Sequence, residues 1–326
     1  AWRKRTQGTS WYNETLDTAT RGSRKEFPAV AVIVMTNVQL TIYDGDDPSL
    51  PMWMVFENAG SLSWASGSAV IYSSVSALNG KIIPTSTTGA VIYDFPSDDT
   101  RLANVAAYKL TSNRALVGRN GATSFASGGD GYALVNSVSN DVAMTVLPNA
   151  PIDAATGLPV PTIAVATDGG VSVITDSGDV WDLTYLVGGN NRVYSVGLST
   201  SGVLSWGSYD PLDNNVGVQH IQVKDVLPTA DNNTAPDRLY SGGYGAVVPD
   251  LYLVQPVPDS YITDYENVSG GLAIGTMSGL NLLNEDPTTP ANGMVNYITS
   301  SFQSGWQNGD IKGAWLSDTV AEVVTQ

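Results

Sequence analysis

The chain alternates short apolar segments with small polar turns, and one combination of them recurs. It consists of a strand, a polar turn that contains a glycine, and a second strand, as in KIIPTSTTGAVIYDF, where Gly89 lies in the turn. The other glycines at this position of the repeat are Gly131, Gly170, Gly202, Gly245 and Gly279. Successive copies are 42, 39, 32, 43 and 34 residues apart. A recurring unit of about 40–50 residues with several short strands is typical of a β-propeller.

An earlier hairpin, AVAVIVMTNVQLTIYDGD, turns near Asn37 and lies 52 residues before Gly89. The pattern therefore predicts about seven hairpins and an all-β fold, a β-propeller of about six or seven blades over residues 29–300. Blades approach each other most closely at the inner strands along the central channel, which favours Gly, Ala, Ser and Thr there. A β-sandwich whose hairpins only look periodic is the alternative fold.

The two ends of the chain do not follow the repeat. Residues 1–28 are polar and are expected to form an irregular N-terminal arm, and residues 301–326 are expected to form a C-terminal exit segment of a longer protein. One short helix is expected within Arg101–Asn113, where apolar residues recur at 102, 105, 106 and 110.

Composition agrees with many strands joined by tight turns. The 31 acidic residues comprise 25 Asp and only 6 Glu, and there are 6 Lys, so strong helix formers are scarce and turn formers are plentiful. The absence of cysteine excludes disulfides, thiolate zinc sites and cysteine nucleophiles. The longest apolar stretch, Phe27–Met35, is about half as long as a membrane-spanning helix, so we expect a buried strand there and no membrane insertion.

Charge is distributed unevenly. A formal net charge of −16 repels phosphate backbones, so a nucleic-acid partner is not expected. Residues 1–26 carry a net charge of +3 and the remainder −19. The six basic residues of this segment are Arg3, Lys4, Arg5, Arg21, Arg24 and Lys25. A basic arm on an acidic body is typical of a docking segment, and a solvated terminus is the alternative interpretation.

The chain offers few types of residue that are suited to catalysis. The one histidine, His220, lies in an alternating strand without a nucleophile motif, so no catalytic residue, metal ligand or cofactor site is assigned. The aspartates of DGDDP lack the spacing of a calcium loop, which favours a hairpin turn. Two acidic turns are instead candidate contact loops. Their residues are Asp44, Asp46 and Asp47 in the first, and Asp210, Asp213, Asn214 and Asn215 in the second.

The segment from Asp176 to Trp181 fits D-x-G-x-x-W and resembles the Asp-box hairpin of sialidase-like propellers. The resemblance implies that the aspartate ties the turn and that the tryptophan packs beneath it, which is a structural role. A sialidase would also need three convergent arginines, a tyrosine nucleophile and an acidic residue. The arginines available in the blades are Arg101, Arg114, Arg119, Arg192 and Arg238.

Two longer stretches resemble large virion proteins of marine tailed bacteriophages. The first runs from Arg21 to Phe56 and includes NVQLTIYDGDDPSLPMWMVF, and the second, GLAIGTMSGLNLLNEDPTTP, begins at Gly271 and continues to Thr319. Within the second, the GWQNGDIK segment at Gly305–Lys312 looks like a connector out of the repeats. The resemblance implies a tail-fibre-like or tail-associated protein in which a propeller-like region precedes a lectin module.

Three functions remain open on this reading. The first is a non-enzymatic structural component of a tailed-phage virion, expected to be a homo-oligomer bound to other virion proteins and to attach to a host-surface glycan or protein. The second is a secreted carbohydrate-active propeller, sialidase-like or lyase-like, and the third is a cellular interaction scaffold. The acidic, cysteine-free and Lys-poor composition suits an extracellular particle, because closed sheets then supply the stability.

Overall fold

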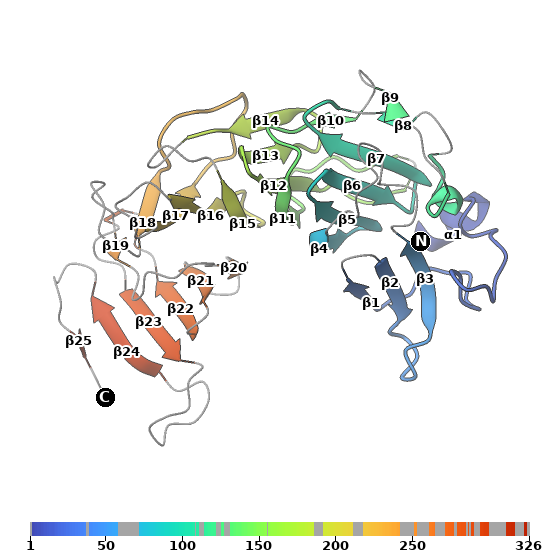
Figure 1. Cartoon of the computed structure of the whole chain (residues 1–326), viewed down its shortest axis with the longest axis horizontal. Coiled ribbons are helices and arrows are strands. Elements are labelled where there is room, and N and C mark those ends of the chain that lie inside the picture. Colours follow the sequence, from blue (N-terminus) through green and yellow to red (C-terminus); the bar gives the residue numbers. More distant parts are fainter. Residues whose placement is uncertain are drawn as a thin grey trace. The chain divides into compact units, whose positions relative to one another are not determined.

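A computed structural model describes most of the chain, and nearly all of its regular structure is β (Figure 1). The described residues are 2–36, 39–57, 72–107, 109–110, 114–121, 125–126, 131–154, 156–185, 192–210, 218–241, 251–252, 261–264, 271–276, 279–284, 286, 288–289, 294–299, 311–316 and 323–324. Helical structure in this part is limited to α1 (Trp2–Arg5) and the 3₁₀ turns η1 (Thr6–Gly8) and η2 (Leu116–Gly118). The expectation of an all-β fold is confirmed.

The chain divides into two compact units. Unit 1 comprises Ala1–Thr162 and Ile174–Val180, and unit 2 comprises Ile163–Val173 and Trp181–Gln326. In the described residues, unit 1 contains a three-stranded sheet of order β1-β2-β3 and a five-stranded sheet of order β10-β7-β6-β5-β4, besides the pair β8-β9. The strands are β1 (Ala31–Met35), β2 (Gln39–Asp44), β3 (Met52–Glu57), β4 (Tyr72–Leu78), β5 (Lys81–Ser86), β6 (Gly89–Asp94), β7 (Asp99–Asn104), β8 (Lys109–Leu110), β9 (Phe125–Ala126) and β10 (Tyr132–Ala133).

The division between the units passes through a four-stranded sheet of order β11-β12-β13-β14. Unit 2 also holds a five-stranded sheet, β15 to β19, and a six-stranded sheet, β20 to β25, each in chain order. The strands of the four-stranded sheet are β11 (Ser139–Thr145), β12 (Thr162–Thr167), β13 (Gly170–Ile174) and β14 (Val180–Leu183). The remaining strands are β15 (Val193–Leu198), β16 (Leu204–Asp210), β17 (Val218–Lys224), β18 (Arg238–Ser241), β19 (Leu251–Tyr252), β20 (Tyr261–Asp264), β21 (Gly271–Thr276), β22 (Gly279–Asn284), β23 (Met294–Thr299), β24 (Ile311–Leu316) and β25 (Val323–Val324).

Successive sheets within each unit meet at their first strands. In unit 1, β4 lies against β11 and also approaches β1, and in unit 2, β15 lies against β20. The contact between β4 and β11 is made by small side chains, since the Ser73 hydroxyl donates to the Ser139 carbonyl over 2.7 Å. A serine permits this approach because its side chain is short and can satisfy a backbone carbonyl of the neighbouring sheet. The expected use of small residues where sheets converge is thus found at β4 and β11.

The repeated turn has a specific chemistry at two positions. The Ser86 hydroxyl donates to the Gly89 carbonyl, and the Thr167 hydroxyl donates to the Gly170 carbonyl, each over 2.9 Å. Gly89 and Gly170 have φ of +136° and +132°, and a β-carbon on either would lie within 2.4 Å of a carbonyl oxygen of the next strand. The hairpin between β21 and β22 has the same sequence form, with Thr276 paired to Gly279. The sequence signature is therefore Ser or Thr, two residues, then Gly.

Two expected repeats have a different place. Gly202 lies between β15 and β16, the first two strands of its sheet, whereas the hairpins at Gly89, Gly170 and Gly279 join the second strand to the third. Gly131 directly precedes β10, which pairs parallel to β7 and so extends the sheet that already contains Gly89. Gly245 and Asn37 lie outside the described residues.

The helix expected within Arg101–Asn113 is not formed in its described part. Residues up to Asn104 belong to β7, and Lys109–Leu110 form β8. Leu102 and Ala103 are neighbours in β7 and both are buried, so this part of the strand is covered on both faces. The helical spacing of apolar residues was therefore coincidental.

The main apolar core of unit 1 extends across both of its larger sheets and includes part of the arm. Trp11 is completely buried, its indole N–H donates to the Phe95 carbonyl over 2.9 Å, and its ring contacts those of Trp53 and Phe95 edge-on. Such edge-on aromatic pairs each contribute about 0.5–1.5 kcal/mol beyond burial. Residues 1–28 contain α1 and η1 besides turns, and at Trp11 they form part of the core. Within the described residues, no helix is long and apolar enough to cross a membrane.

We predict that Gly89→Ala lowers the free energy of unfolding by roughly 1–3 kcal/mol, because the new β-carbon meets the Ala103 carbonyl at 2.4 Å in a backbone conformation with φ of +136°. Urea unfolding measures the change. Gly8→Ala is the matched control, since a β-carbon there meets no atom within 4 Å. Equal stability of the two variants would refute the structural role of the repeated glycine.

Candidate functional site

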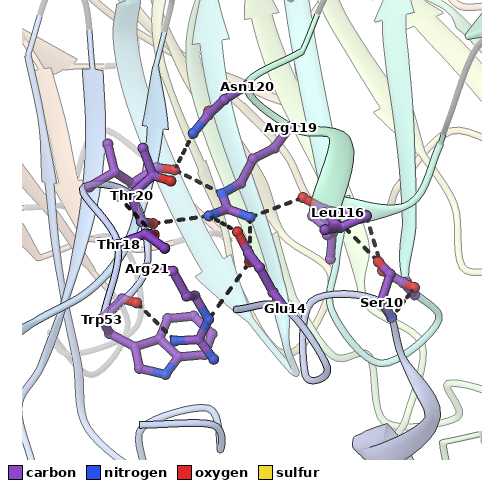
Figure 2. A network of polar contacts seen from close by, with 12 residues as sticks. Ser10, Glu14, Thr18, Thr20, Arg21, Trp53, Leu116, Arg119 and Asn120 are labelled. Carbon is purple, nitrogen blue, oxygen red and sulfur yellow. Dashed lines mark hydrogen bonds and ion pairs between the residues drawn. The ribbon is translucent and has the colours of Figure 1, made fainter. Parts of the chain in front are cut away.

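A buried ionic network fixes the N-terminal arm to unit 1 (Figure 2). Arg119, which directly follows η2, donates from both terminal nitrogens to the two carboxylate oxygens of Glu14 over 2.8 and 2.9 Å. Its remaining donors reach the Val55 carbonyl of β3 over 2.8 Å and the Thr20 carbonyl of the arm over 3.0 Å. One guanidinium thus joins the arm, β3 and the segment after η2, with a side-chain exposure of only 1%.

A second arginine lies beside the same carboxylate. Arg21 is fully buried, its Nε is 3.8 Å from a Glu14 oxygen, and it donates to the Trp53 carbonyl over 2.9 Å. Its guanidinium lies 4.6 Å from the centre of the Trp53 ring, which is within the range of a cation–π contact. Burial lowers the pKa of Arg21 to about 10, although Glu14 opposes the shift. Arg21 therefore remains charged at neutral pH.

The arm also adds backbone pairing to the first sheet. The Gly22 N–H donates to the Trp53 carbonyl over 3.0 Å, and the Val55 N–H donates to the Thr20 carbonyl over 2.9 Å. A β-carbon on Gly22 would lie 2.0 Å from the Met52 carbonyl oxygen, so this close approach requires glycine. The segment from Thr20 to Gly22 thus lies along the outer edge of β3, where Arg21 and Met54 form an isolated antiparallel bridge.

The start of the arm is held at a second place. Asp98 accepts from the Ser10 N–H over 2.6 Å, from the Ser10 hydroxyl over 2.8 Å and from the Leu116 N–H over 3.0 Å. The carboxylate of Asp98 thereby links the arm to η2. The Ser10 hydroxyl also accepts from the Val117 N–H of η2 over 3.2 Å, and Figure 2 shows Ser10 beside Leu116.

The first predicted contact loop is the hairpin turn between β2 and β3, and much of its charge is used within unit 1. Arg24 donates to Asp44 and Asp46 over 2.8 Å each. Asp46 also accepts the N–H groups of Ala29 and Val30, the residues directly before β1, over 2.8 and 2.9 Å. The hydrogen bond from Ala29 is the largest cause that places the pKa of Asp46 below its ordinary value of 3.8. This loop therefore sets where β1 begins.

Asp47 forms the end of that turn, where its carboxylate accepts the N–H and the hydroxyl of Ser49 over 2.9 and 2.8 Å. These hydrogen bonds lower the pKa of Asp47, the bond from the Ser49 N–H most of all. In the second predicted loop, Asp210 is the last residue of β16. Asp213, Asn214 and Asn215 lie outside the described residues.

The predicted docking residues divide into two groups. Arg21 and Arg24 are bound within unit 1 by the contacts given above. The sequence did not reveal these contacts, because a charge pattern does not show which charges are paired in the fold. Lys4, Arg5 and Lys25 are exposed, and Lys25 lies over the Tyr12 ring at 5.5 Å. Arg3 belongs to α1, and its side chain lies outside the described part.

Two of the five arginines available in the predicted blades do meet. Arg101 and Arg114 both donate to Asp99, over 2.9 Å from the Arg101 Nε and over 2.6 and 2.5 Å from the Arg114 fork. Tyr132 of β10 lies beside them, with its ring centre 5.9 Å from the Arg101 guanidinium. Burial would raise the pKa of Asp99, but the hydrogen bonds from both arginines outweigh it and hold the pKa below its ordinary value. We call these four residues the Asp99 cluster.

The other arginines pair separately. Arg119 binds Glu14, Arg192 lies 2.9 Å from Asp168, and Arg238 lies 2.5 Å from Asp225. Three convergent arginines are not formed by this set in the described residues. His220 is buried in β17 opposite Ser208.

The turn at Asp176 differs from the Asp-box interpretation. Thr175 and Asp179 hold it, through donation from the Asp179 N–H to the Thr175 hydroxyl over 3.1 Å and from the Thr175 N–H to the Asp179 carbonyl over 2.9 Å. Trp181 is half-buried. The hairpin is formed, but a threonine and not the first aspartate ties it.

Sequence reasoning missed Glu14, Asp98 and Asp99. For Glu14 the sequence did offer a signal, the aromatic residues Trp11 and Tyr12 nearby. Large aromatic residues in a polar terminal segment indicate that this segment packs against the core. Within the described residues, no group of three or more His, Cys, Asp or Glu side chains is arranged to hold a metal ion.

Comparison with known proteins identifies no family. No family model matches the chain, and no curated protein matches it. Among solved structures, Hsv2 of Kluyveromyces marxianus matches with a TM-score of 0.38 and 8% identity over 86% of this chain and 65% of that one. Hsv2 of Kluyveromyces lactis matches with a TM-score of 0.33 and 13% identity, over 88% and 60% of the two chains.

The designed protein Ika8 matches with a TM-score of 0.34 and 10% identity, over 89% of this chain and 94% of that one. The chain spans somewhat less than two thirds of the length of each of the two Hsv2 proteins. These similarities determine neither a blade count nor a function.

We predict that Glu14→Gln lowers the free energy of unfolding by about 3–5 kcal/mol, because it leaves Arg119 and Arg21 buried without a carboxylate. Chemical denaturation measures the loss. Glu26→Gln, at an exposed residue of the same arm, is the control and should change stability by less than about 0.5 kcal/mol. A small effect of Glu14→Gln would mean that the network does not anchor the arm.

A pH dependence follows from Asp46. Its folded pKa lies below the ordinary 3.8, so the carboxylate stabilises the fold above that pH, and this contribution is lost as the pH falls through the folded pKa. We predict that Asp46→Asn is less stable than the parent at pH 6 and that the difference shrinks as the pH falls below about 3.8.

Unfolding curves at a series of pH values test this prediction. Asp176→Asn, in the turn that Thr175 and Asp179 hold, is the control for a general effect of replacing an aspartate by asparagine. A difference for Asp46→Asn that stays constant down to pH 3 would contradict the assignment.

Proposed function

We propose that the protein is a non-enzymatic structural component of a tailed-phage virion, a propeller-like body that presents a rigid surface for assembly and for attachment to the host. The sequence resemblance of Arg21–Phe56 and Gly271–Thr319 to virion proteins motivates the proposal. The observation that carries it is the use of charge. Seven arginines of the described part form ion pairs with carboxylates: Arg21, Arg24, Arg101, Arg114, Arg119, Arg192 and Arg238.

The ion pair of Arg119 with Glu14 joins residues 105 positions apart, and that of Arg114 with Asp99 joins residues 15 positions apart. Charged side chains that form ion pairs between segments support a rigid body, because breaking a buried ion pair strongly destabilises the fold. A catalytic acid or base needs instead a group that can exchange its proton near the working pH. Asp99 has a lowered pKa, which suits a permanent ionic tie.

The propeller-like arrangement is supported by the order of the sheets. Apart from β10 in the second sheet, each larger sheet is built from consecutive strands, and within each unit the first strands of successive sheets lie together. Blades that meet at their first strands line the channel of a propeller in the same way. The isolated bridge between Arg21 and Met54 adds pairing at the edge of β3.

Docking would use the exposed basic residues of the arm. Lys4 and Lys25 remain at the surface while the body carries the excess of aspartate. An acidic neighbouring subunit, including another copy of this chain, is the partner that complements them. The proposal includes no cofactor.

The carbohydrate-active alternative requires a third arginine at the Asp99 cluster. Arg119, the next arginine in the chain, is held instead by Glu14 with 1% side-chain exposure. The arrangement therefore favours the structural role over a sialidase-like reaction.

We predict that mass spectrometry of purified particles detects the protein at a copy number that fits three-, six- or twelvefold symmetry. Host-cell lysate from uninfected cells is the control. Hydrolysis of a sialoside or polysaccharide by the purified protein, abolished by Asp99→Asn but not by Asp168→Asn, would overturn the proposal in favour of an enzyme. Absence of the protein from particles would also overturn it.

A further inference from the structure

We propose that the open edge of β1 is a dimer interface, at which a second copy of this chain adds its own β1 in antiparallel register. β1 (Ala31–Met35) is the first strand of the three-stranded sheet, and in the described residues it pairs only with β2. The inference goes beyond the proposed function, because it rests on the first sheet alone. The dimer and the virion role are tested by different measurements and can fail separately.

The first argument is the direction of the backbone groups of β1. At one end of its pairing with β2, the Gly45 N–H donates to the Val30 carbonyl over 2.8 Å. At the other end, the Thr36 N–H donates to the Gln39 carbonyl over 2.8 Å. Alternate residues of an antiparallel strand bond to the same neighbour, so the even-numbered residues of β1 direct their backbone groups to β2.

The odd-numbered residues, Ala31, Ile33 and Met35, therefore direct their N–H and C=O groups to the opposite edge. Natural proteins commonly protect such an edge with a lysine, a proline or a bulge. The strand AVIVM has no charged residue and no proline, and its pairing with β2 shows no register shift. In the described part of the chain, this edge can therefore accept a further strand.

The second argument is that the edge is complementary to itself. A twofold axis at Ile33 places Ala31 of one copy opposite Met35 of the other, so each outward backbone group meets an outward group. The same register places Val32 opposite Val34 of the second copy on the exposed face of the sheet. Val32 is 36% exposed and Val34 is 44% exposed in the single chain. Pairing would remove part of this apolar surface from water.

The third argument is charge, which favours a second copy as the partner. The net charge of −16 makes two copies repel each other over most of their surfaces. Residues 27–43, which include β1 and β2 up to Tyr43, contain no charged side chain. Contact between two copies at β1 therefore places no like charges opposite each other along the strand. A charged partner segment would find no opposite charge on this strand, whereas an identical strand needs none.

Sedimentation velocity of the full chain over a series of concentrations tests the proposal. We expect a monomer–dimer equilibrium with a dissociation constant between about 1 and 100 μM, since a strand of five residues forms a small interface. The double variant Val32→Lys/Val34→Lys should dimerise at least about tenfold more weakly, because like charges then lie opposite each other. Val226→Lys, at a valine that is 76% exposed outside the first sheet, is the control and should change the dissociation constant by less than about twofold.

An exchange of charge tests the register. Val32→Glu/Val34→Glu should also be monomeric by itself, and its mixture with Val32→Lys/Val34→Lys should form a heterodimer, because each lysine then lies opposite a glutamate. Unfolding midpoints check that each variant folds. The single variant Val34→Lys supplies the comparison if a double variant does not fold.

The proposal is wrong if the parent chain stays monomeric at about 1 mM, if both double variants dimerise as the parent does, or if Val226→Lys causes an equal loss. Absence of the heterodimer would contradict the antiparallel register. Amide hydrogen exchange separates the remaining occupant of the edge. A monomer whose Ile33 amide exchanges as slowly as the amides paired between β2 and β3 would show that another segment of the chain covers β1, and would also overturn the proposal.

Discussion

The pairing of Arg119 with Glu14 is the interaction on which the rest of unit 1 depends. Arg119 and Glu14 are far apart in the chain, and the Arg119 guanidinium also donates to carbonyl groups of β3 and of the arm. A buried ion pair adds little net stability over a well-packed apolar contact, but the loss of one partner is costly. The pair therefore acts mainly by specifying one position for the arm. Trp11, which enters the core between Trp53 and Phe95, depends on that position.

A second constraint acts on the sheets themselves. The turns at Gly89 and Gly170 bring each hairpin so close to the next strand that a β-carbon has no room, and a hydroxyl at the preceding corner closes each turn. Tight turns of this kind keep the strands short and in register. Short serine side chains on β4 then allow the contact with β11. Together these features explain how a chain with few helix formers and no cysteine packs its strands into successive sheets.

The sequence allowed the all-β class and the hairpins at Gly89, Gly170 and Gly279 to be predicted, because glycine spacing and apolar alternation are local signals. The place of Gly202 within its sheet could not be predicted, since a local pattern does not say which strand of a sheet comes first. The helix expected at Arg101 was wrong for a related reason. Burial on both faces of a strand produces apolar neighbours that a helical period also fits.

The candidate site was less accessible to sequence reasoning. The arginines Arg101 and Arg114 were named as candidates, but their meeting at Asp99 depends on the position of Arg114 beside the start of β7, which a local pattern does not give. The docking role of the basic arm was predicted from its charge alone. Of its members, Arg21 and Arg24 have partners inside the fold, and only tertiary structure shows which charges remain for other molecules.

Amide hydrogen exchange of the full chain tests the central claim most directly, namely that the arm is fixed in place along the edge of the first sheet. The N–H groups of Gly22 and Val55 each donate across the arm–β3 boundary. The account predicts that both exchange as slowly as the amides paired between β2 and β3. Rapid exchange at Gly22 and Val55, with protection retained between β2 and β3, would contradict it and would restore the arm to a free docking segment.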